Sequence, residues 1–297
     1  MAIVVFDFGG TSVKYGLWAA DQLAQQGAFT TPATWVEMQE SLLATFKELK
    51  SHADTVQGVA FSLPGVVDNE KGEIRGESAI PYIHNFPIKA AFSEMFGGLP
   101  VAMENDANCA ALAELWKGSA KDVNNALVIA LGTGIGGSVI LNRQLFRGRD
   151  LVGGEFGYMK LGPQLTWSQM GTVVNAAARY NDQNPGGEPV TGKQLFELAA
   201  AGDVLAQTEL NKFYDYNAQG LFNLISSFNP DRIILAGGVS ARKDLPGILA
   251  ERVSNLLKWA NLTAATVDIQ TSRFSNDANL VGAVKNFTDW HPEVTLA

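Results

Sequence analysis

The chain has 297 residues, of which 46% are hydrophobic and 18% charged, and its net charge is -8. These values are typical of a soluble protein with a large core divided into two domains. The acidic balance argues against nucleic acid or an anionic membrane surface as a partner, although backbone amides and magnesium could still hold phosphate locally. One cysteine, Cys109, excludes an intrachain disulfide, and the sequence contains no signal peptide or membrane span, so we expect a cytoplasmic protein.

The N-terminal segment predicts two strands joined by a glycine turn. Residues 3–6 form a β-branched and aromatic run typical of a buried strand, and residues 13–18 form a second strand. Gly9 and Gly10 break the chain between them, which gives a strand–turn–strand unit instead of the strand–turn–helix of a Walker loop.

This first turn carries groups suited to phosphate and magnesium. The groups that could meet phosphate oxygens are the turn amides at Gly9 and Gly10, the Thr11 hydroxyl and the Lys14 ammonium. Asp7, at the strand end, could hold a hydrated magnesium ion. A glycine hairpin with an ordinary surface lysine is the alternative, because two glycines in a turn are common.

A proline-bounded loop follows the next helix and strand, which we expect over 35–51 and 56–63. The loop, residues 78–87, contains Tyr82, His84 and Asn85 and could contact sugar hydroxyls. A lone histidine in a loop is more often a surface or capping residue, and a ligand contact by His84 is left open.

Asp106 lies where a strand at 101–103 gives way to an Ala/Leu-rich helix that runs through Trp116. A short helix at 88–96, ended by two glycines, precedes this strand. By itself Asp106 reads as a helix N-cap, since aspartate is favoured there. Asp106 lies between two Gly/Thr turns that could hold the phosphates of a nucleotide, and this favours a carboxylate that faces the group being phosphorylated.

A second glycine–threonine turn repeats the plan of residues 3–18. Strands at 127–131 and 137–141 flank a turn that contains Thr133, Gly134 and Gly136. A hairpin needs fewer glycines than this turn has, so we expect close backbone approach to a ligand. Two such units predict a duplicated architecture.

The remaining segments are a glycine-flanked acid, several helices and a third glycine turn. Glu155 stands among glycines and could contact a ligand, and Gly237 with Gly238 could admit a flat ring. We expect helices at 170–180, 192–201, 203–228 and 245–260, strands at 233–235 and 267–270, and a last helix capped by Asp277.

Taken together, six segments resemble the ROK family of sugar kinases in the actin-like ATPase superfamily. They are 7–14 and 131–137 for phosphate, 64–68 and 104–108 for the sugar, 153–157 for the sugar glutamate and 236–240 for adenosine. Each is weak alone, but the six in the family's order make a specific match.

The resemblance implies an α/β, two-domain actin-like ATPase (ribonuclease H-like) fold with a mixed sheet in each domain and a cleft between them. We expect a small domain of residues 1–106 plus 277–297 and a larger one of residues 107–276. The implied reaction transfers the γ-phosphate of ATP, with Mg²⁺, to the 6-hydroxyl of a hexose. A homodimer is also implied.

The site residues follow from the same resemblance. Asp106 is the implied catalytic base. The implied sugar-binding residues are Gly65, Asn85, Asn105, Glu155 and Tyr158. The implied nucleotide-binding residues are Asp7, Gly9, Gly10, Thr11, Lys14, Thr133, Gly134, Gly136, Gly237 and Gly238, with Asp7 holding magnesium through water.

The chain departs from the family after Glu155. Tyr158 stands where many members have a histidine, and residues 160–171 lack the cysteines of their zinc loop, so we expect no zinc site. A second sugar glutamate would fall near Ser168 or Gln169. We expect glucose or a β-glucoside such as cellobiose as substrate, with N-acetylmannosamine as the runner-up. The alternative is that the region repacks around Trp167 without changing the sugar specificity.

Other classes of protein share parts of this pattern. A sugar-responsive repressor of the same family would carry a DNA-binding segment ahead of Asp7, where six residues stand here. A non-catalytic sensor would lack the base or a phosphate loop. An acetate-kinase-like enzyme or a chaperone ATPase would share the fold, but Asn105, Asp106 and Glu155 favour a polyol substrate.

Overall fold

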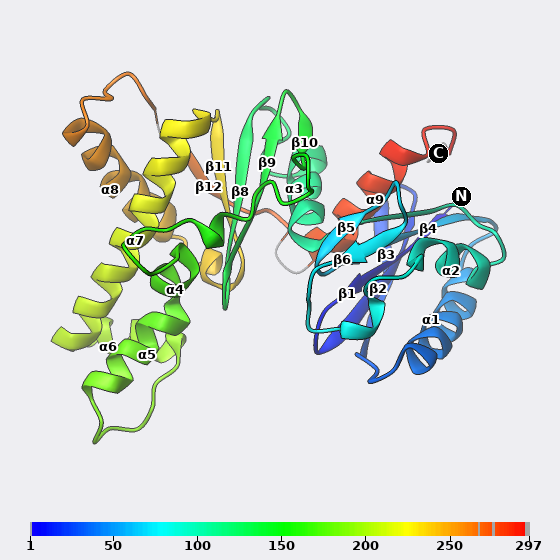
Figure 1. Ribbon diagram of the computed structural model, residues 1–297, viewed down its shortest axis with the longest axis horizontal. Helices are drawn as coiled ribbons and strands as arrows, with labels where there is room; N and C mark the ends of the chain where they lie inside the picture. Colours follow the sequence, from blue (N-terminus) through cyan, green and yellow to red (C-terminus); the bar gives the residue numbers. More distant parts are fainter. Residues whose placement is uncertain (1, 267, 275–276, 295–297) are drawn as a thin grey trace. The chain divides into compact units, whose positions relative to one another are not determined.

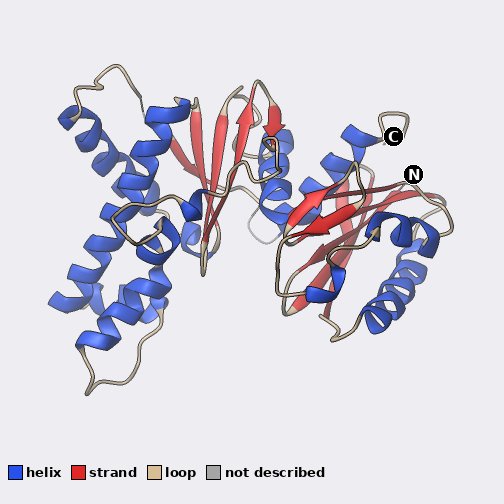
Figure 2. Ribbon diagram, in the orientation of Figure 1, coloured by secondary structure: helices blue, strands red, loops and turns tan. Residues whose placement is uncertain are grey.

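The computed structural model describes residues 2–266, 268–274 and 277–294. The chain forms two compact units (Figure 1): Met1–Lys121, Gly148–Val152 and Asn276–Ala297 make the first, and Asp122–Arg147 with Gly153–Ser275 make the second. Each unit contains a mixed sheet with helices packed on it, as the strands and helices of Figure 2 show. Among the described helices, none combines the length and apolar composition that a membrane span requires.

The first unit is built on a five-stranded sheet with the order β3-β2-β1-β4-β7. Its strands are β1 (Ala2–Phe8), β2 (Ser12–Ala19), β3 (Gln22–Thr30), β4 (Val56–Leu63) and β7 (Val101–Asn105). The first three are antiparallel, whereas β4 and β7 run parallel to β1. The predicted strand–turn–strand unit is confirmed, and β3, which the apolar pattern did not reveal, extends it.

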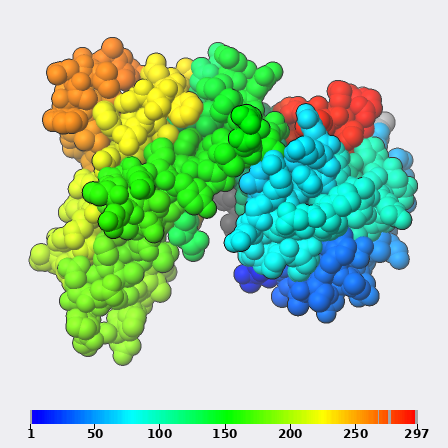
Figure 3. All heavy atoms as spheres, in the orientation of Figure 1, coloured from blue at the N-terminus to red at the C-terminus, as the bar shows by residue number. Residues whose placement is uncertain are grey.

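Helices of the first unit pack on this sheet. They are α1 (Trp35–Lys50), α2 (Ile88–Met95), α3 (Asp106–Lys117) and α9 (Ala278–Trp290), with a short turn η1 (Pro81–Ile83) and a small hairpin β5 (Val66–Asp68)–β6 (Glu73–Arg75). The Phe61 ring of β4 stacks on the Phe92 ring of α2 with centroids 3.9 Å apart. In Figure 3 the red atoms of the C-terminal segment lie beside the cyan and teal atoms of this unit.

The C-terminal helix α9 packs against α3 and against β4 and β7. Asn286 on this helix donates a hydrogen bond to the carbonyl oxygen of Met103 at 3.2 Å. The expected cap by Asp277 is wrong: Asp277 stands at the N-cap position, but its backbone is helical and its side chain makes no capping hydrogen bond. We expected the first domain to end at residue 106 and to include the C-terminal segment. Because α3 packs on α9 of that segment, we propose that α3 belongs to the first unit as well.

The second unit repeats the sheet plan of the first. Its order is β10-β9-β8-β11-β12, with β8 (Ala126–Leu131), β9 (Ile135–Leu141), β10 (Gln144–Phe146), β11 (Arg232–Ala236) and β12 (Ile269–Thr271). Here β8, β9 and β10 pair antiparallel, and β11 and β12 run parallel to β8. The duplicated architecture is therefore confirmed. Val267, the first residue of the expected last strand, lies outside the described residues.

Helices of the second unit are α4 (Trp167–Gly171), α5 (Val173–Gln183), α6 (Gly192–Ala200), α7 (Val204–Phe228) and α8 (Leu245–Trp259), with the turns η2 (Phe156–Tyr158) and η3 (Gly238–Ala241). The single helix expected at 170–180 is two helices, because Thr172 is extended and its side chain accepts a hydrogen bond from the Asn175 amide. That N-cap ends α4 and starts α5.

Candidate functional site

In the first unit, the predicted site residues gather at the carboxyl ends of the parallel strands. Asp7 on β1 is in register with Ser62 on β4, and Ser62 is in register with Glu104 on β7. Asn105 ends β7 and Asp106 begins α3. Ligands commonly bind at this edge of α/β sheets, because loops and helix N-termini converge there.

Asp7 is buried and held from two directions. Its Oδ1 accepts hydrogen bonds from the Ser62 hydroxyl at 2.7 Å and from the Asn279 amide nitrogen at 3.1 Å. Burial raises the pKa of Asp7, against the opposing effects of these bonds and of the charge of Lys14, which is opposite Asp7 in the β1–β2 register. A fixed carboxylate at a strand end fits an oxygen-preferring, water-bound magnesium ion.

The first glycine turn is tight and tied to β3. The Gly9 amide donates to the Ser12 carbonyl oxygen at 3.0 Å, and the Thr31 amide donates to the Thr11 carbonyl oxygen at 3.0 Å. The Thr31 hydroxyl also donates to the Gly9 carbonyl oxygen at 2.6 Å. Gly10 and Thr11 stay exposed at the tip of the turn, where a phosphate could approach them.

Asn105, not Asp106, is the N-cap of α3. The Asn105 Oδ1 accepts hydrogen bonds from the Ala107 and Asn108 amides at 3.0 and 3.2 Å. Asp106 is the first helical residue and is half-buried, and its Oδ1 accepts from the Ala107 amide at 2.8 Å. The alternative role of Asp106 as the N-cap is therefore wrong, and its carboxylate lies at the positive end of the helix dipole.

Glu104 supports the turn that presents Asp106. It is 2% exposed, and its Oε1 accepts from the Asn105 amide at 2.9 Å and from the Asn108 side-chain nitrogen at 3.0 Å. Bonds to a buried carboxylate are stronger than neutral ones and fix the groups that donate them. Glu104 therefore orients Asn105, directly before Asp106, and Asn108, two residues after it.

The Gly65 turn contacts Asn105 and packs against His84 of the 78–87 loop. The Gly65 carbonyl oxygen accepts from the Asn105 Nδ2 at 3.0 Å. Gly65 has φ +95°, and a Cβ there would lie 2.9 Å from Cε1 of His84. The His84 Nε2 is 2.7 Å from the Ser78 hydroxyl, and burial lowers the pKa of the imidazole. Asn85 is exposed and left-handed, with φ 61°.

In the second unit, two glycine turns line one pocket. It has a volume of 540 Å³ and is lined by Leu131, Gly132, Thr133, Val173, Val174, Gly192, Lys193, Phe196, Glu197, Ala200, Gly238, Val239 and Arg242. Thr133 from the second predicted turn and Gly238 from the third therefore share one cavity, as expected for a nucleotide site.

The backbone explains why these turns are glycine-rich. The Gly132 amide donates to the Gly134 carbonyl oxygen at 2.9 Å, and Thr133 and Gly134 are exposed. Gly237 has φ +84°, and a Cβ there would lie 2.5 Å from the Leu131 carbonyl oxygen. Gly136 lies within β9, opposite Ala130, instead of in the turn itself.

Phe196 and Arg242 are pocket residues that no motif indicated. The Arg242 guanidinium carbon lies 4.1 Å from the centre of the Phe196 ring, and Arg242 Nη2 donates to Asp244 at 2.6 Å. A stacked cation and ring present a flat, rigid wall. Their positions on α6 and after η3 are distant in sequence, so only the fold brings them together.

Glu155 begins the turn η2 and is exposed, and partial desolvation of its carboxyl raises its pKa. A Cβ on Gly157 would overlap the Ile135 carbonyl oxygen and the Ser168 hydroxyl, so this turn lies directly on the start of β9. Tyr158, at the end of the turn, is 77% exposed. Glu155 and Tyr158, both predicted to bind sugar, thus lie on one turn, and the turn of residues 132–134 that precedes β9 lies beside it.

The residues expected near a second sugar glutamate have structural partners. Gln169 forms a capping box with Thr166, and Ser168 accepts from the Ile135 amide at 2.9 Å. Among the described residues, no group of three or more histidine, cysteine, aspartate or glutamate side chains is arranged to hold a metal ion. Whether the protein contains zinc stays a prediction.

The model of the ROK family matches residues 3–289. The chain belongs to the ROK family. A β-glucoside kinase from Klebsiella pneumoniae is 34% identical over an alignment that covers 97% of this chain and 96% of that relative. The expected family and sugar-kinase class are thereby confirmed.

Solved ROK structures match the fold. A ROK family protein from Streptococcus pneumoniae in complex with sucrose is 35% identical, with a TM-score of 0.88, covering 99% of this chain and 100% of that one. A ROK glucokinase from Streptomyces griseus in complex with glucose and AMPPNP is 25% identical, with a TM-score of 0.74, covering 95% and 98%. The expected α/β actin-like fold is confirmed.

Proposed function

We propose that this ROK sugar kinase transfers the γ-phosphate of ATP to the 6-hydroxyl of glucose or of a β-glucoside such as cellobiose, with Asp106 as the base. One observation carries the proposal: Asn105 caps α3, so the cap function does not explain Asp106. The Asp106 carboxylate can then act as the base at the edge of the sheet where ligands commonly bind.

The second unit supplies the adenosine site in this proposal. The 540 Å³ pocket has apolar walls and polar turns, which suits a flat base with phosphates attached. A Cβ on Gly238 would meet no atom within 4 Å, so space lies beside this residue. The AMPPNP bound by the Streptomyces glucokinase supports the choice of ATP.

The phosphate groups would meet the amides of the glycine turns. Exposed backbone N–H groups at Thr133 and Gly134 can donate to phosphate oxygens, as can those at Gly10 and Thr11, with Lys14 adding positive charge. A hydrated magnesium ion held at Asp7 would supply further charge neutralisation.

Asp106 acts as a general base in this scheme. Its carboxylate accepts the proton of the 6-hydroxyl while the hydroxyl oxygen forms a bond to the γ-phosphorus and the bond to the β-phosphate oxygen breaks. ADP leaves with the electron pair, and the sugar 6-phosphate is formed. Phosphoryl transfer depends mainly on positioning and charge neutralisation, so Glu104 and Asn105 contribute by fixing Asp106.

The sugar assignment rests on the Glu155 turn and on the relatives. Glu155 would accept hydrogen bonds from sugar hydroxyls. Tyr158 presents an exposed ring three residues further on, and an aromatic face suits the apolar face of a second sugar ring. The β-glucoside kinase from Klebsiella supports a β-linked substrate, and the glucose complex from Streptomyces supports the glucose ring.

A product analysis tests the proposal. Purified protein with ATP and magnesium is offered glucose, cellobiose, mannose, N-acetylglucosamine and N-acetylmannosamine, and ADP release is followed. Phosphorus NMR then locates the new phosphate on the ring. We expect a 6-phosphate from glucose or cellobiose. Phosphorylation at another hydroxyl, or ADP release that no sugar accelerates, would contradict the proposal. Light scattering on the same sample tests the expected homodimer.

A further inference from the structure

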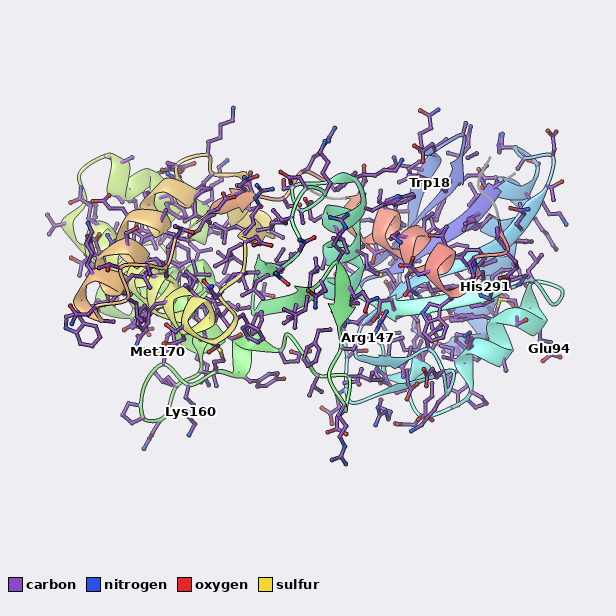
Figure 4. The ribbon with its side chains drawn as sticks, turned by 90° about the horizontal axis from the view of Figure 1, so that it is seen from above. Trp18, Glu94, Arg147, Lys160, Met170 and His291 are labelled. Atoms are coloured by element: carbon purple, nitrogen blue, oxygen red, sulfur yellow. The ribbon has the colours of Figure 1, made fainter. Side chains whose placement is uncertain are left out.

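The short helix α4 is fixed by one buried tryptophan. Trp167 is fully buried, and its Nε1 donates to the Asn217 Oδ1 at 3.1 Å. The Trp167 amide also donates to the Met159 carbonyl oxygen at 2.7 Å, and a Cβ on Gly220 would overlap the indole ring. Figure 4 labels Lys160, before this helix, and Met170, within it.

Asn217 completes the anchor from α7. It is buried, and its Nδ2 donates to the Gly171 carbonyl oxygen at 2.8 Å and to the Phe213 carbonyl oxygen at 2.7 Å. A satisfied buried amide of this kind fixes the groups around it, since each broken bond would leave a buried polar atom without a partner. The backbone of α4 therefore has little freedom at the residue after Trp167.

That residue, Ser168, contacts the start of β9, directly after the turn of residues 132–134, and it also contacts the turn of residues 155–158. Its hydroxyl accepts from the Ile135 amide at 2.9 Å and lies 3.5 Å from the Ile135 carbonyl oxygen. Ile135 directly follows the phosphate turn, residues 132–134. The Gly157 backbone packs on the same hydroxyl so closely that a Cβ on Gly157 would overlap it.

We infer that Ser168 is a positioning residue that sets the phosphate turn (residues 132–134) and the glutamate turn (residues 155–158) in one arrangement. The inference rests on the proposed function, which assigns ATP to the first turn and sugar to the second. The first turn contains two glycines and the second contains one, and glycine restricts the backbone little, so an external contact must define their geometry. The anchored hydroxyl supplies that contact.

This geometry distinguishes positioning from direct sugar binding. The Ser168 hydroxyl oxygen accepts from the Ile135 amide and is covered by the Gly157 backbone, so its contacts are with backbone groups. A positioning residue affects both ligands, because both turns rest on it. A direct sugar ligand would affect the sugar alone. The two roles therefore predict different changes in the two KM values.

The test compares Ser168→Ala, Ser168→Thr and a control, Asp203→Ala, with the wild type. Asp203 caps α7 in the same unit, where its Oδ1 accepts from the Ala206 amide at 2.8 Å. Like Ser168→Ala, this control removes a side-chain acceptor from a backbone amide, and it also removes the Asp203 Oδ2 that accepts from the Tyr180 hydroxyl at 3.1 Å. For each protein we measure kcat, the KM for ATP, the KM for the best sugar and the urea midpoint.

We expect Ser168→Ala to raise both KM values about threefold or more and to lower kcat/KM about tenfold or more, since small misplacements of reacting groups are costly. Ser168→Thr keeps the acceptor oxygen and should therefore show smaller changes in KM and kcat/KM than Ser168→Ala. Asp203→Ala should lower the urea midpoint with both KM values unchanged.

Three results would overturn the inference: unchanged KM values in Ser168→Ala, a rise in the sugar KM alone, or KM changes in Asp203→Ala that match those of Ser168→Ala. Hydrogen exchange gives a readout that needs no activity. Peptides covering 131–141 and 153–159 should both exchange faster in Ser168→Ala. If the wild type phosphorylates no sugar, the proposed function fails, while faster exchange in both peptides would still support the coupling of the two turns.

Discussion

The side chain of Asn105 joins the start of α3 to the Gly65 turn: its Oδ1 caps the helix, and its Nδ2 donates to the Gly65 carbonyl oxygen at 3.0 Å. Both residues were expected to bind sugar, and both have a structural function that holds Asp106 in place. That Asn105 and Gly65 also bind the sugar stays a prediction.

Replacement of Asp106 by asparagine should abolish turnover and leave sugar binding largely intact. The amide keeps the size and some hydrogen bonding of the carboxylate but cannot take a proton, and loss of a positioned base costs on the order of 10²–10⁴ in rate. ADP release gives the rate, and calorimetry gives the sugar affinity. Asp54→Asn, at an exposed position of the same unit, is the control. Near-native turnover in Asp106→Asn would disprove the base assignment.

Asn105→Ala should destabilise the protein by about 1 kcal/mol through the lost N-cap, and the lost Gly65 contact should add to this. Asn105→Ser keeps a capping oxygen and should recover most of the stability without the Gly65 bond. Urea unfolding measures both. If the two variants are equally unstable, the cap geometry does not account for the effect.

Asp7→Asn should stabilise the fold while activity is lost. Burial raises the pKa of Asp7 in the folded state, so folding disfavours the ionised carboxylate. That penalty is fully present when pH lies above the folded pKa, and it fades as pH falls and Asp7 is protonated. The stability gain of the variant should therefore be larger at pH 7 than at pH 4. Urea midpoints at both pH values check this, and a variant less stable than wild type at pH 7 would contradict it.

The untagged protein should contain no stoichiometric zinc, and its activity should require added magnesium. Its one cysteine and three histidines offer no ligand set of the usual kind. In the described residues the segment after Glu155 is held by Trp167 and Asn217, which need no metal. Elemental analysis measures the zinc content. One zinc per chain, or activity lost with a zinc-selective chelator in the presence of magnesium, would refute the prediction.

Tyr158→Ala should lower kcat/KM for cellobiose more than for glucose, because only the disaccharide has a second ring to stack on Tyr158. The matched control is Leu165→Ala, another exposed apolar side chain of the same unit. Steady-state kinetics with glucose, cellobiose, mannose and N-acetylmannosamine measure the preference. A tenfold preference of the wild type for N-acetylmannosamine, about 1.4 kcal/mol of discrimination, would reject the glucoside assignment and keep the kinase assignment.

The sequence by itself determined the elements whose pattern is local. β4 occupies Val56–Leu63 as expected, because a buried strand needs a continuous apolar run. The glycine turns and their order identified the family, since close backbone approach to phosphate restricts the residue type wherever it occurs. Asp106 stands between a strand and a helix, which alone predicts an N-cap, and it could be selected as a site residue because these turns accompany it in the sequence.

Only the tertiary structure decided features that depend on partners distant in the chain. β3 (Gln22–Thr30) has no fully buried residue and no continuous apolar run, and it forms because its backbone pairs with β2. Asn105 caps α3 instead of Asp106, and its side chain also donates to the Gly65 carbonyl oxygen, 40 residues away in the chain. Phe196 meets Arg242, and Ser168 meets Ile135, through packing between elements. Such contacts leave no periodic trace in the sequence, because each depends on where separate segments come to lie.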